Sequence, residues 1–174
     1  MSDFDPVPIG PVHVVGVSGS GDLTVSDLSL MAKWRVFAEE DADVKPGTSR
    51  RGGDQLIWSV SPGEWTILGL KPFEIDSVDL THVRAMFRLT GGDAPRLLAK
   101  LCALDFDDRM FPDRAAARSL FAGVAAELIR DDQAWVPSYL IAPSRSFGLF
   151  VYEAIIDAGE EFGLVEGHPA NPNE

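Results

Sequence analysis

The C-terminal part of the chain carries the pattern that most limits its possible folds, a long apolar stripe at helical spacing. The stripe predicts an amphipathic helix that begins with Ser144 or Ser146 as its N-cap and ends at Gly163. Acidic residues fall between the apolar positions and are expected on the solvent side. An apolar stripe must be buried against another layer, so this helix covers one face of the rest of the protein. The stripe consists of Phe147, Phe150, Val151, Ala154, Ile155, Ala158 and Phe162.

A strand followed by a second helix is predicted in the middle of the chain. From Val83 to Leu89 apolar residues alternate with polar ones, the period of a strand with one face buried and the other carrying charge. Two glycines then end the strand, and Asp93 can cap a helix with Pro95 in its first turn. The apolar face of this helix is Ala94, Leu97, Leu98 and Leu101.

Other strands are indicated by runs of β-branched and aromatic residues bounded by turn residues. Leu56–Val60 and Trp65–Leu68 meet at Ser61-Pro62-Gly63-Glu64, which predicts a hairpin. Leu120 to Arg130 suits either a helix or a buried strand, and we favour a strand because it runs into the turn Asp131-Asp132. The remaining predicted strands are His13–Val17, Leu23–Leu30, Lys33–Ala38 and Trp135–Ala142.

The order of elements predicts the fold class. From Val83 onward we expect strand, helix, strand, strand, helix, an antiparallel α+β pattern within a single domain spanning residues 1–174. Glu39 to Asp54 is predicted as an exposed loop and Ala103 to Arg114 as an ordered one. Residues 1–10 and 166–174 lack periodicity and are expected to be flexible.

Composition excludes several function classes. The formal net charge of −12 argues against nucleic-acid binding, which needs clustered Lys and Arg. No stretch of about 20 apolar residues is present to cross a membrane, and the N-terminus does not resemble a signal peptide. The single cysteine, Cys102, fits a reducing compartment, so we expect a cytoplasmic protein.

Basic residues gather in the middle of the chain, where they could orient a partner or an anionic ligand or simply form a solvated surface. We favour the solvated surface for most of them. The group comprises Arg84, Arg88, Arg96, Lys100, Arg109, Arg114 and Arg118.

Sequence motifs for catalysis or metal binding are weak. The histidines and Cys102 are scattered, the aspartates near Asp105 lack the glycine and glutamate of a calcium loop, and no Gly-x-Ser-x-Gly motif occurs. We therefore predict no catalytic residue and no metal site. The four tryptophans could line an aromatic pocket, but each is expected in the core. They are Trp34, Trp58, Trp65 and Trp135.

One candidate anion site precedes the last helix. Arg145 lies within Ser144-Arg145-Ser146-Phe147, where an arginine beside a helix N-terminus can bind a carboxylate or phosphate. The favoured alternative pairs Arg145 with an aspartate of the Ala103–Asp113 loop.

The hairpin Leu56 to Trp65, the strand end Phe87-Arg88-Leu89-Thr90-Gly91 and the segment Ser144–Phe147 carry a family resemblance. Between Leu56 and Gly163 the chain resembles the gamma subunit of heterotetrameric sarcosine oxidase. The hairpin Leu56 to Trp65 is similar to that family's Leu-Trp-x-Gly-Pro-Asp-Glu-Trp hairpin, although the turn here is Ser61-Pro62-Gly63-Glu64. Further pieces follow in the family's order. Asp113-Arg114 replaces a glycine that the family places after its Phe-Pro pair. These pieces are Val78-Asp79-Leu80-Thr81, Phe87-Arg88-Leu89-Thr90-Gly91, Ala94–Leu98, Leu104-Asp105, Met110-Phe111-Pro112, Ser144–Phe147, Asp157-Ala158 and Glu161-Phe162-Gly163.

The resemblance implies a fold and a function. The fold would resemble the folate-binding domain of the glycine-cleavage aminomethyltransferase, with two ferredoxin-like lobes of antiparallel sheet and helices on one face. The function would be that of a non-catalytic subunit beside alpha, beta and delta subunits. In that complex sarcosine is oxidised to glycine, tetrahydrofolate accepts the one-carbon unit, and FAD, FMN, NAD and zinc belong to the partner subunits.

Two alternatives stay open. The chain could be the corresponding subunit of an N-methylglutamate dehydrogenase. It could also be a stand-alone tetrahydrofolate-binding or one-carbon-transfer module, in which Trp65, Arg84 and Arg145 would line the pocket for the pteridine and the glutamyl carboxylate.

Overall fold

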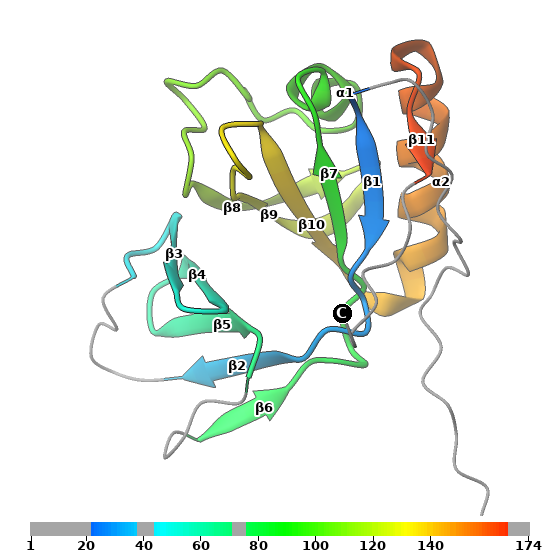
Figure 1. Ribbon diagram of the computed structural model, residues 1–174. Helices are drawn as coiled ribbons and strands as arrows, with labels where there is room; N and C mark the ends of the chain where they lie inside the picture. Colours follow the sequence, from blue (N-terminus) through cyan, green and yellow to red (C-terminus); the bar gives the residue numbers. More distant parts are fainter. Residues whose placement is uncertain (1–21, 38–43, 71–75, 167–174) are drawn as a thin grey trace, which may run out of the picture.

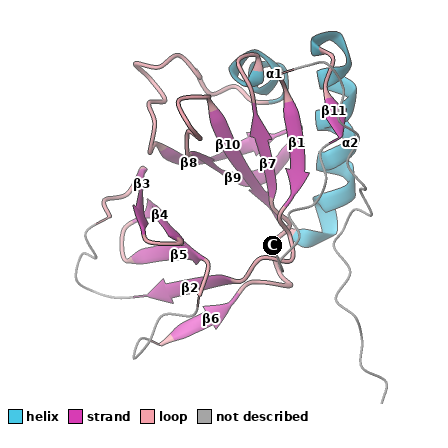
Figure 2. Ribbon diagram, viewed as in Figure 1, coloured by secondary structure: helices cyan, strands magenta, loops and turns pink. Residues whose placement is uncertain are grey.

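Two β-sheets pack face to face, and two α-helices cover the outer face of one of them (Figure 1; Figure 2). The computed structural model describes residues 22–37, 44–70 and 76–166. The predicted strand His13–Val17 and most of the expected flexible ends lie outside these residues. Among the described helices, none is long and apolar enough to cross a membrane.

The six-stranded sheet has the order β11-β1-β7-β10-β9-β8. Its neighbours are antiparallel except for the parallel pair β1 and β11. The strands are β1 (Thr24–Asp27), β7 (Phe87–Thr90), β8 (Ala116–Phe121), β9 (Val124–Arg130), β10 (Ser138–Pro143) and β11 (Val165–Glu166).

The five-stranded sheet has the order β3-β4-β5-β2-β6 and is antiparallel throughout. All of it is inserted between β1 and β7, two strands that are neighbours in the other sheet. Its strands are β2 (Lys33–Phe37), β3 (Thr48–Gly52), β4 (Gln55–Ser61), β5 (Glu64–Leu68) and β6 (Ser77–Asp79).

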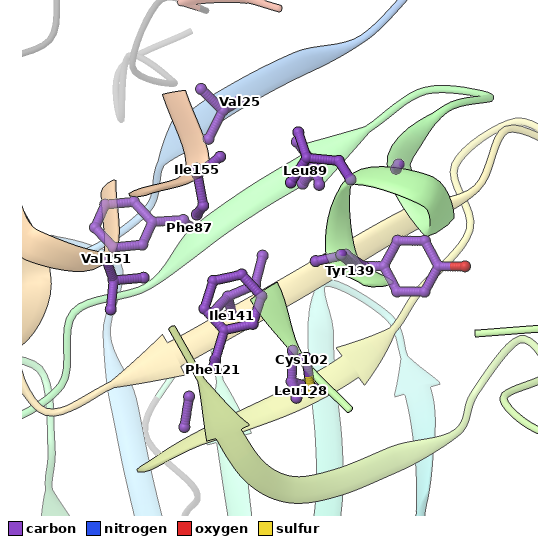
Figure 3. Close-up of a cluster of buried hydrophobic side chains, with 14 of the residues drawn as sticks. Val25, Phe87, Leu89, Cys102, Phe121, Leu128, Tyr139, Ile141, Val151 and Ile155 are labelled. Carbon is purple, nitrogen blue, oxygen red and sulfur yellow. The ribbon is translucent and has the colours of Figure 1, made fainter. Parts of the chain in front are cut away.

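Both helices pack on the same face of the six-stranded sheet, as predicted. α1 (Ala94–Leu101) buries Leu97 and Leu98, and α2 (Gly148–Gly159) buries Val151 and Ile155. Short 3-10 helices precede and follow α2, over Arg145–Phe147 and Glu160–Phe162. Figure 3 shows Val151 and Ile155 of α2 beside Phe87 of the sheet.

A second apolar layer fills the space between the two sheets. Trp58, Leu56 and Leu68 of the five-stranded sheet contact Ile129 and Leu140 of the six-stranded sheet. Strand side chains alternate between faces, so β7, β9 and β10 each supply one face to the helices and the other to this layer. The polar face of β7 is therefore not a solvated surface but part of the contact between sheets.

Several predicted elements are confirmed. The hairpin of β4 and β5 turns at Pro62-Gly63, β1 and β2 lie within their predicted ranges, and the 103–114 loop has no helix or strand. The α+β class with antiparallel sheets is also confirmed. Gly163 adopts a left-handed conformation after α2 with φ of 65°, as expected of a residue that ends a helix.

Other predictions about elements are wrong. The loop expected over Glu39–Asp54 contains β3, which pairs with β4. Two strands were expected between the two helices, but the structure has three. The additional strand is Ala116–Phe121, which pairs with β9 across a turn at Ala122-Gly123. β7 begins only at Phe87, and Val83 lies in a turn with an exposed side chain.

Cap and core assignments also differ in detail. Asp93 takes the N-cap position of α1, but its carboxylate binds Arg96 rather than a helix amide. Ser144 precedes the 3-10 helix, and Phe147 is the N-cap of α2. Phe147 and Phe150, predicted on the buried stripe, are about half exposed. Trp58 and Trp65 are core residues and Trp34 is half-buried, whereas Trp135 is 100% exposed and lies before β10 in a turn.

Candidate functional site

The most unusual chemistry of the molecule is a buried carboxylate between the sheets, Glu127. It lies on the face of β9 that points to the five-stranded sheet, and only 2% of the residue is exposed. Oε1 accepts hydrogen bonds from Arg35 Nη2 and Arg118 Nη2, both at 2.9 Å, and Oε2 accepts one from Trp58 Nε1 at 2.8 Å. Arg84 Nη2 lies 3.5 Å from Oε1.

The surroundings keep Glu127 ionised. Burial alone would raise its pKa, but the hydrogen bonds from Trp58 and Arg118 and the charges of Arg35 and Arg84 outweigh burial and hold the pKa below its ordinary value. Glu64 of β5 adds a second carboxylate by pairing with Arg35. The cluster thus joins residues of both sheets through charge.

A second buried carboxylate, Asp131, follows the end of β9 and is 0% exposed. Its Oδ1 accepts from Arg51 Nε at 2.8 Å and its Oδ2 from Arg88 Nη2 at 2.8 Å. Arg114 Nη1 also donates to Oδ1, and Gln133 Nε2 donates to Oδ2 at 3.0 Å. Arg51 comes from β3 and Arg88 from β7, so this cluster also bridges the sheets.

Asp131 is likewise held in its charged form. Burial raises its pKa, but the hydrogen bonds from Arg51 and Arg88 and the charges of these two arginines lower the pKa by more. The pKa of Asp131 is therefore below its usual range. A general base works best with a pKa near the operating pH and within reach of a substrate proton. Both carboxylates are therefore suited to hold the sheets together rather than to exchange protons.

A pocket of about 300 Å³ opens beside the Asp131 cluster. Leu28, Leu56 and Leu68 give it an apolar wall, while the guanidinium groups of Arg51 and Arg88 give it a polar one. Its other lining residues are Ser26, Met31, Asp54 and Gln133. The pocket lies where the two sheets meet, since its walls come from β1, β3, β4, β5 and β7.

Lys33 is a third buried charge. Its ammonium group donates to the carbonyl oxygens of Ser29 at 2.8 Å and Met31 at 2.7 Å, both in the connection that leads from β1 to β2. Burial lowers the pKa of Lys33 to about 8, with Arg145 adding to the effect and Asp27 and Asp79 opposing it.

The predicted pocket residues Trp65, Arg84 and Arg145 occupy two places. Trp65 is buried beside Val36 and Ile67 and donates its Nε1 hydrogen to the carbonyl oxygen of Val44 at 3.0 Å. Side chains along β5 alternate between the two faces of the sheet. Because Leu68 faces the six-stranded sheet, Trp65, three residues earlier, points to the opposite face.

Arg84 and Arg145, in contrast, lie close together. Arg84 forms an isolated bridge with Ser144, and the amide of Arg145 donates to the carbonyl oxygen of Val83 at 3.0 Å. The side chain of Arg84 reaches Glu127 and the carbonyl oxygen of Ala142, while Arg145 lies near Lys33. Aspartate Asp108 of the 103–113 loop, the kind of partner expected for Arg145, is bound by Arg130.

Glu127, Asp131 and their arginines were not identified from the sequence. The sequence favours a solvated surface for Arg84, Arg88, Arg114 and Arg118, yet all four reach a buried carboxylate. A usable signal exists, because Glu127 and Asp131 continue the same face of β9 as buried Ile129. Among the described residues, no group of three His, Cys, Asp or Glu side chains is placed to hold a metal ion.

No protein-family model matches the sequence, and no curated protein sequence matches it either. Solved structures do match the fold. One similar fold is that of the glycine-cleavage aminomethyltransferase T from Bartonella henselae, with a TM-score of 0.63 and 15% sequence identity over 85% of this chain and 48% of that one. The chain thus spans about half the length of that aminomethyltransferase.

A more complete match is a chain of the heterotetrameric sarcosine oxidase from Corynebacterium, solved in complex with pyrrole 2-carboxylate. The TM-score is 0.71 and the sequence identity 19%, over 84% of this chain and 88% of that one. The two chains are similar in length and share one fold over most of each chain. The fold that the sequence resemblance implied is confirmed.

Proposed function

We propose that this chain is a non-catalytic subunit of a heterotetrameric amine-oxidising flavoenzyme, the counterpart of the gamma subunit of sarcosine oxidase. The supporting observation is the match of fold to a chain of that enzyme over 84% of this chain and 88% of the other. This chain covers only 48% of the aminomethyltransferase. The oxidase subunit, which is similar to this chain in length, is therefore the better guide to its function.

The buried charges agree with this role. Glu127 and Asp131 are each bonded to arginines from both sheets, which uses their charge inside the protein. At the same time, large apolar side chains such as Phe147, Leu149 and Phe150 are about half exposed along the start of α2. Exposed apolar groups of this size suit a surface that a partner covers.

In this proposal the chemistry resides on the partners. Alpha, beta and delta subunits carry FAD, FMN, NAD and zinc, and the cytoplasmic complex oxidises sarcosine to glycine with tetrahydrofolate as the one-carbon acceptor. The alternative substrate is N-methylglutamate, for a complex of the dehydrogenase type.

Co-expression tests the proposal. The chain is produced together with the products of its neighbouring genes, purified through a tag on the chain alone, and examined for stoichiometric flavin and for oxidation of sarcosine and of N-methylglutamate. We expect a complex with flavin in it, and the substrate that is turned over distinguishes the two enzymes. Purification of the chain without any flavoprotein would contradict the proposal.

Binding of tetrahydrofolate by the chain alone is a second candidate, favoured by the aminomethyltransferase fold and the pocket between the sheets. Ser26, Asp54 and Gln133 offer polar atoms to a pteridine ring, and the leucines offer an apolar wall. Of the residues predicted for such a pocket, Arg84 and Arg145 lie close together, and Trp65 lies on the face of β5 that points away from the six-stranded sheet.

Calorimetric titration of the isolated chain with tetrahydrofolate separates the candidates. A subunit without its own ligand gives no saturable heat. A folate-binding module gives saturable binding that Arg51→Gln weakens and Arg50→Gln does not, since Arg50 lies on the same strand with its side chain on the other face.

A further inference from the structure

The turn between β9 and β10 exposes a tryptophan completely. Gln133 and Val136 are paired by two backbone hydrogen bonds of 3.0 and 2.9 Å, leaving Ala134 and Trp135 as the two residues of a tight turn. Trp135 is 100% exposed and Val136 beside it is 38% exposed. An indole that contacts no core contributes nothing to folding by burial.

The backbone of this turn is also unfavourable for the residues it contains. Ala134 has a φ of 48° and Trp135 a φ of 70°, so both occupy the left-handed region. Turns of this kind favour Asn and Gly, because a side chain clashes with the backbone there. Neither the turn nor the core therefore explains a tryptophan at this position.

The turn is nevertheless held rigidly by the buried Asp131 cluster. Gln133 Nε2 donates to the carbonyl oxygen and to Oδ2 of Asp131, both at 3.0 Å. Arg51, Arg88 and Arg114 fix the same carboxylate from three directions. The exposed indole thus projects from one of the most strongly bonded parts of the molecule, which lowers the entropy lost when it binds a partner.

The loop that meets this turn carries acidic side chains. The amide of Asp132 donates to Oδ1 of Asp113 at 3.0 Å, which brings the 103–114 loop against the turn at one end of the six-stranded sheet (Figure 1). Side chains of Asp108 and Asp113 in this loop are 83% and 43% exposed, and they pair with Arg130 and Arg114 respectively. With a formal net charge of −12, a second copy of the chain or an anionic membrane would be repelled.

We propose that Trp135 is the anchor by which this chain docks on a different protein, inserting its indole into an apolar pocket bordered by Lys and Arg. Tryptophan is enriched among the residues that dominate binding energy, and a ring of polar contacts around it excludes water. This inference rests on the proposed function for the identity of the partner, a flavin-carrying subunit of the proposed complex.

Binding of the full chain to that purified flavoprotein tests the inference. Wild type, Trp135→Gly, Trp135→Ala and the control Leu70→Ala are compared by surface plasmon resonance. Leu70 is 75% exposed and follows β5 in the other sheet. Both Trp135 variants are expected to raise Kd at least about 30-fold, the level of a dominant contact, and Leu70→Ala is expected to leave it unchanged.

Thermal unfolding adds a readout that separates docking from folding. Glycine relieves the left-handed strain at position 135, so Trp135→Gly is expected to raise Tm by roughly 2–4 °C while it weakens binding. A variant that is more stable but binds worse cannot owe its defect to misfolding.

The failures are distinguishable. Wild-type affinity in both Trp135 variants would overturn the anchor and leave the proposed subunit role standing, whereas absence of binding by the wild type would overturn both. Self-association of the chain in sedimentation that Trp135→Gly abolishes would overturn the choice of partner. A blue shift of tryptophan fluorescence with phosphatidylserine vesicles, lost in the same variant, would also do so.

Discussion

Glu127 brings together arginines from several strands and the indole of Trp58, so at the scale of single residues the two sheets are joined by charge as well as by apolar contact. Such clusters are costly to desolvate, and their net contribution to stability is small. Removing only one member of such a cluster is destabilising, because the remaining charges stay buried without a partner.

Replacing Glu127 by Gln tests this. The substitution removes the negative charge that faces Arg35, Arg84 and Arg118, and we expect it to lower the free energy of unfolding by about 3 kcal/mol. Glu161→Gln is the control, because Glu161 pairs with Lys100 at the surface, where ion pairs contribute about 0–1 kcal/mol. Urea unfolding at neutral pH measures both.

The stability difference between wild type and Glu127→Gln should also depend on pH. The pKa of Glu127 is lower when folded than when unfolded, so its contribution is present above the ordinary carboxyl pKa and is lost as pH falls through the folded value. The difference between wild type and Glu127→Gln should therefore shrink below about pH 4.5. A difference that stays constant into acid would contradict the proposed charge on Glu127.

Lys33 also favours folding as pH rises, but in the alkaline range. Its folded pKa of about 8 lies below the ordinary 10.5, so between these values the unfolded chain binds more protons and folding becomes more favourable as pH rises. Relative to Lys33→Met, the wild type should gain up to about 3 kcal/mol of unfolding free energy from pH 8 to 10.5. Guanidinium unfolding of both proteins across this range measures the gain.

At the scale of elements, periodic patterns with clear ends were predictable. The stripe of α2 and the short helix α1 were recognised by spacing, and the β4–β5 hairpin by its Pro-Gly turn. Strands β3 and β8 were not, for a physical reason. Their sequences TSRRG and AARSLF are short on β-branched and aromatic residues, and tertiary pairing overrides so weak a propensity.

The candidate site was less predictable than the fold. The sequence suggests that Arg88 of β7 and Arg118 of β8 lie on a face exposed to solvent. The pattern of one strand does not reveal that a second sheet covers this polar face. The same argument applies to Trp135. Its residue type favours the core, and only the tight turn at Gln133 and Val136 places it outside.

Gly91 joins β7 to α1 in a conformation that other residues avoid. Its φ is 144°, and a Cβ there would lie 2.6 Å from the carbonyl oxygen of Asp22 and 2.7 Å from Leu23 Cα. Gly91→Ala is expected to lower the free energy of unfolding by at least about 2 kcal/mol, because the backbone just before β1 must move. Gly92→Ala is the control, since nothing lies within 4 Å of its Cβ, and thermal unfolding compares the two. Equal Tm values would contradict the close approach.

At the scale of the whole molecule, the sheets share one apolar layer and two ion clusters, so we propose that residues 1–174 form a single domain. A domain of this kind unfolds as one unit. Tryptophan fluorescence reports mainly on Trp58 and Trp65 of the five-stranded sheet, and far-UV circular dichroism at helical wavelengths reports on α1 and α2.

We therefore expect the two signals to change at the same urea concentration in the wild type. Glu127→Gln weakens the joint between the sheets, and we expect its two transitions to separate. Fluorescence that is lost at lower urea than helicity in the wild type itself would contradict a single domain.

The way the five-stranded sheet is inserted between β1 and β7 suggests that it can be removed as a unit. The chain leaves the six-stranded sheet after Asp27 and returns at Phe87, residues that pair with each other, and Leu28 N donates to Met86 O at 2.8 Å just beyond them. A two-residue connector could therefore replace the whole inserted sheet without disturbing strand order. Such a shortened protein would keep its helical layer but expose Glu127 and Asp131 to water, where they no longer need arginines.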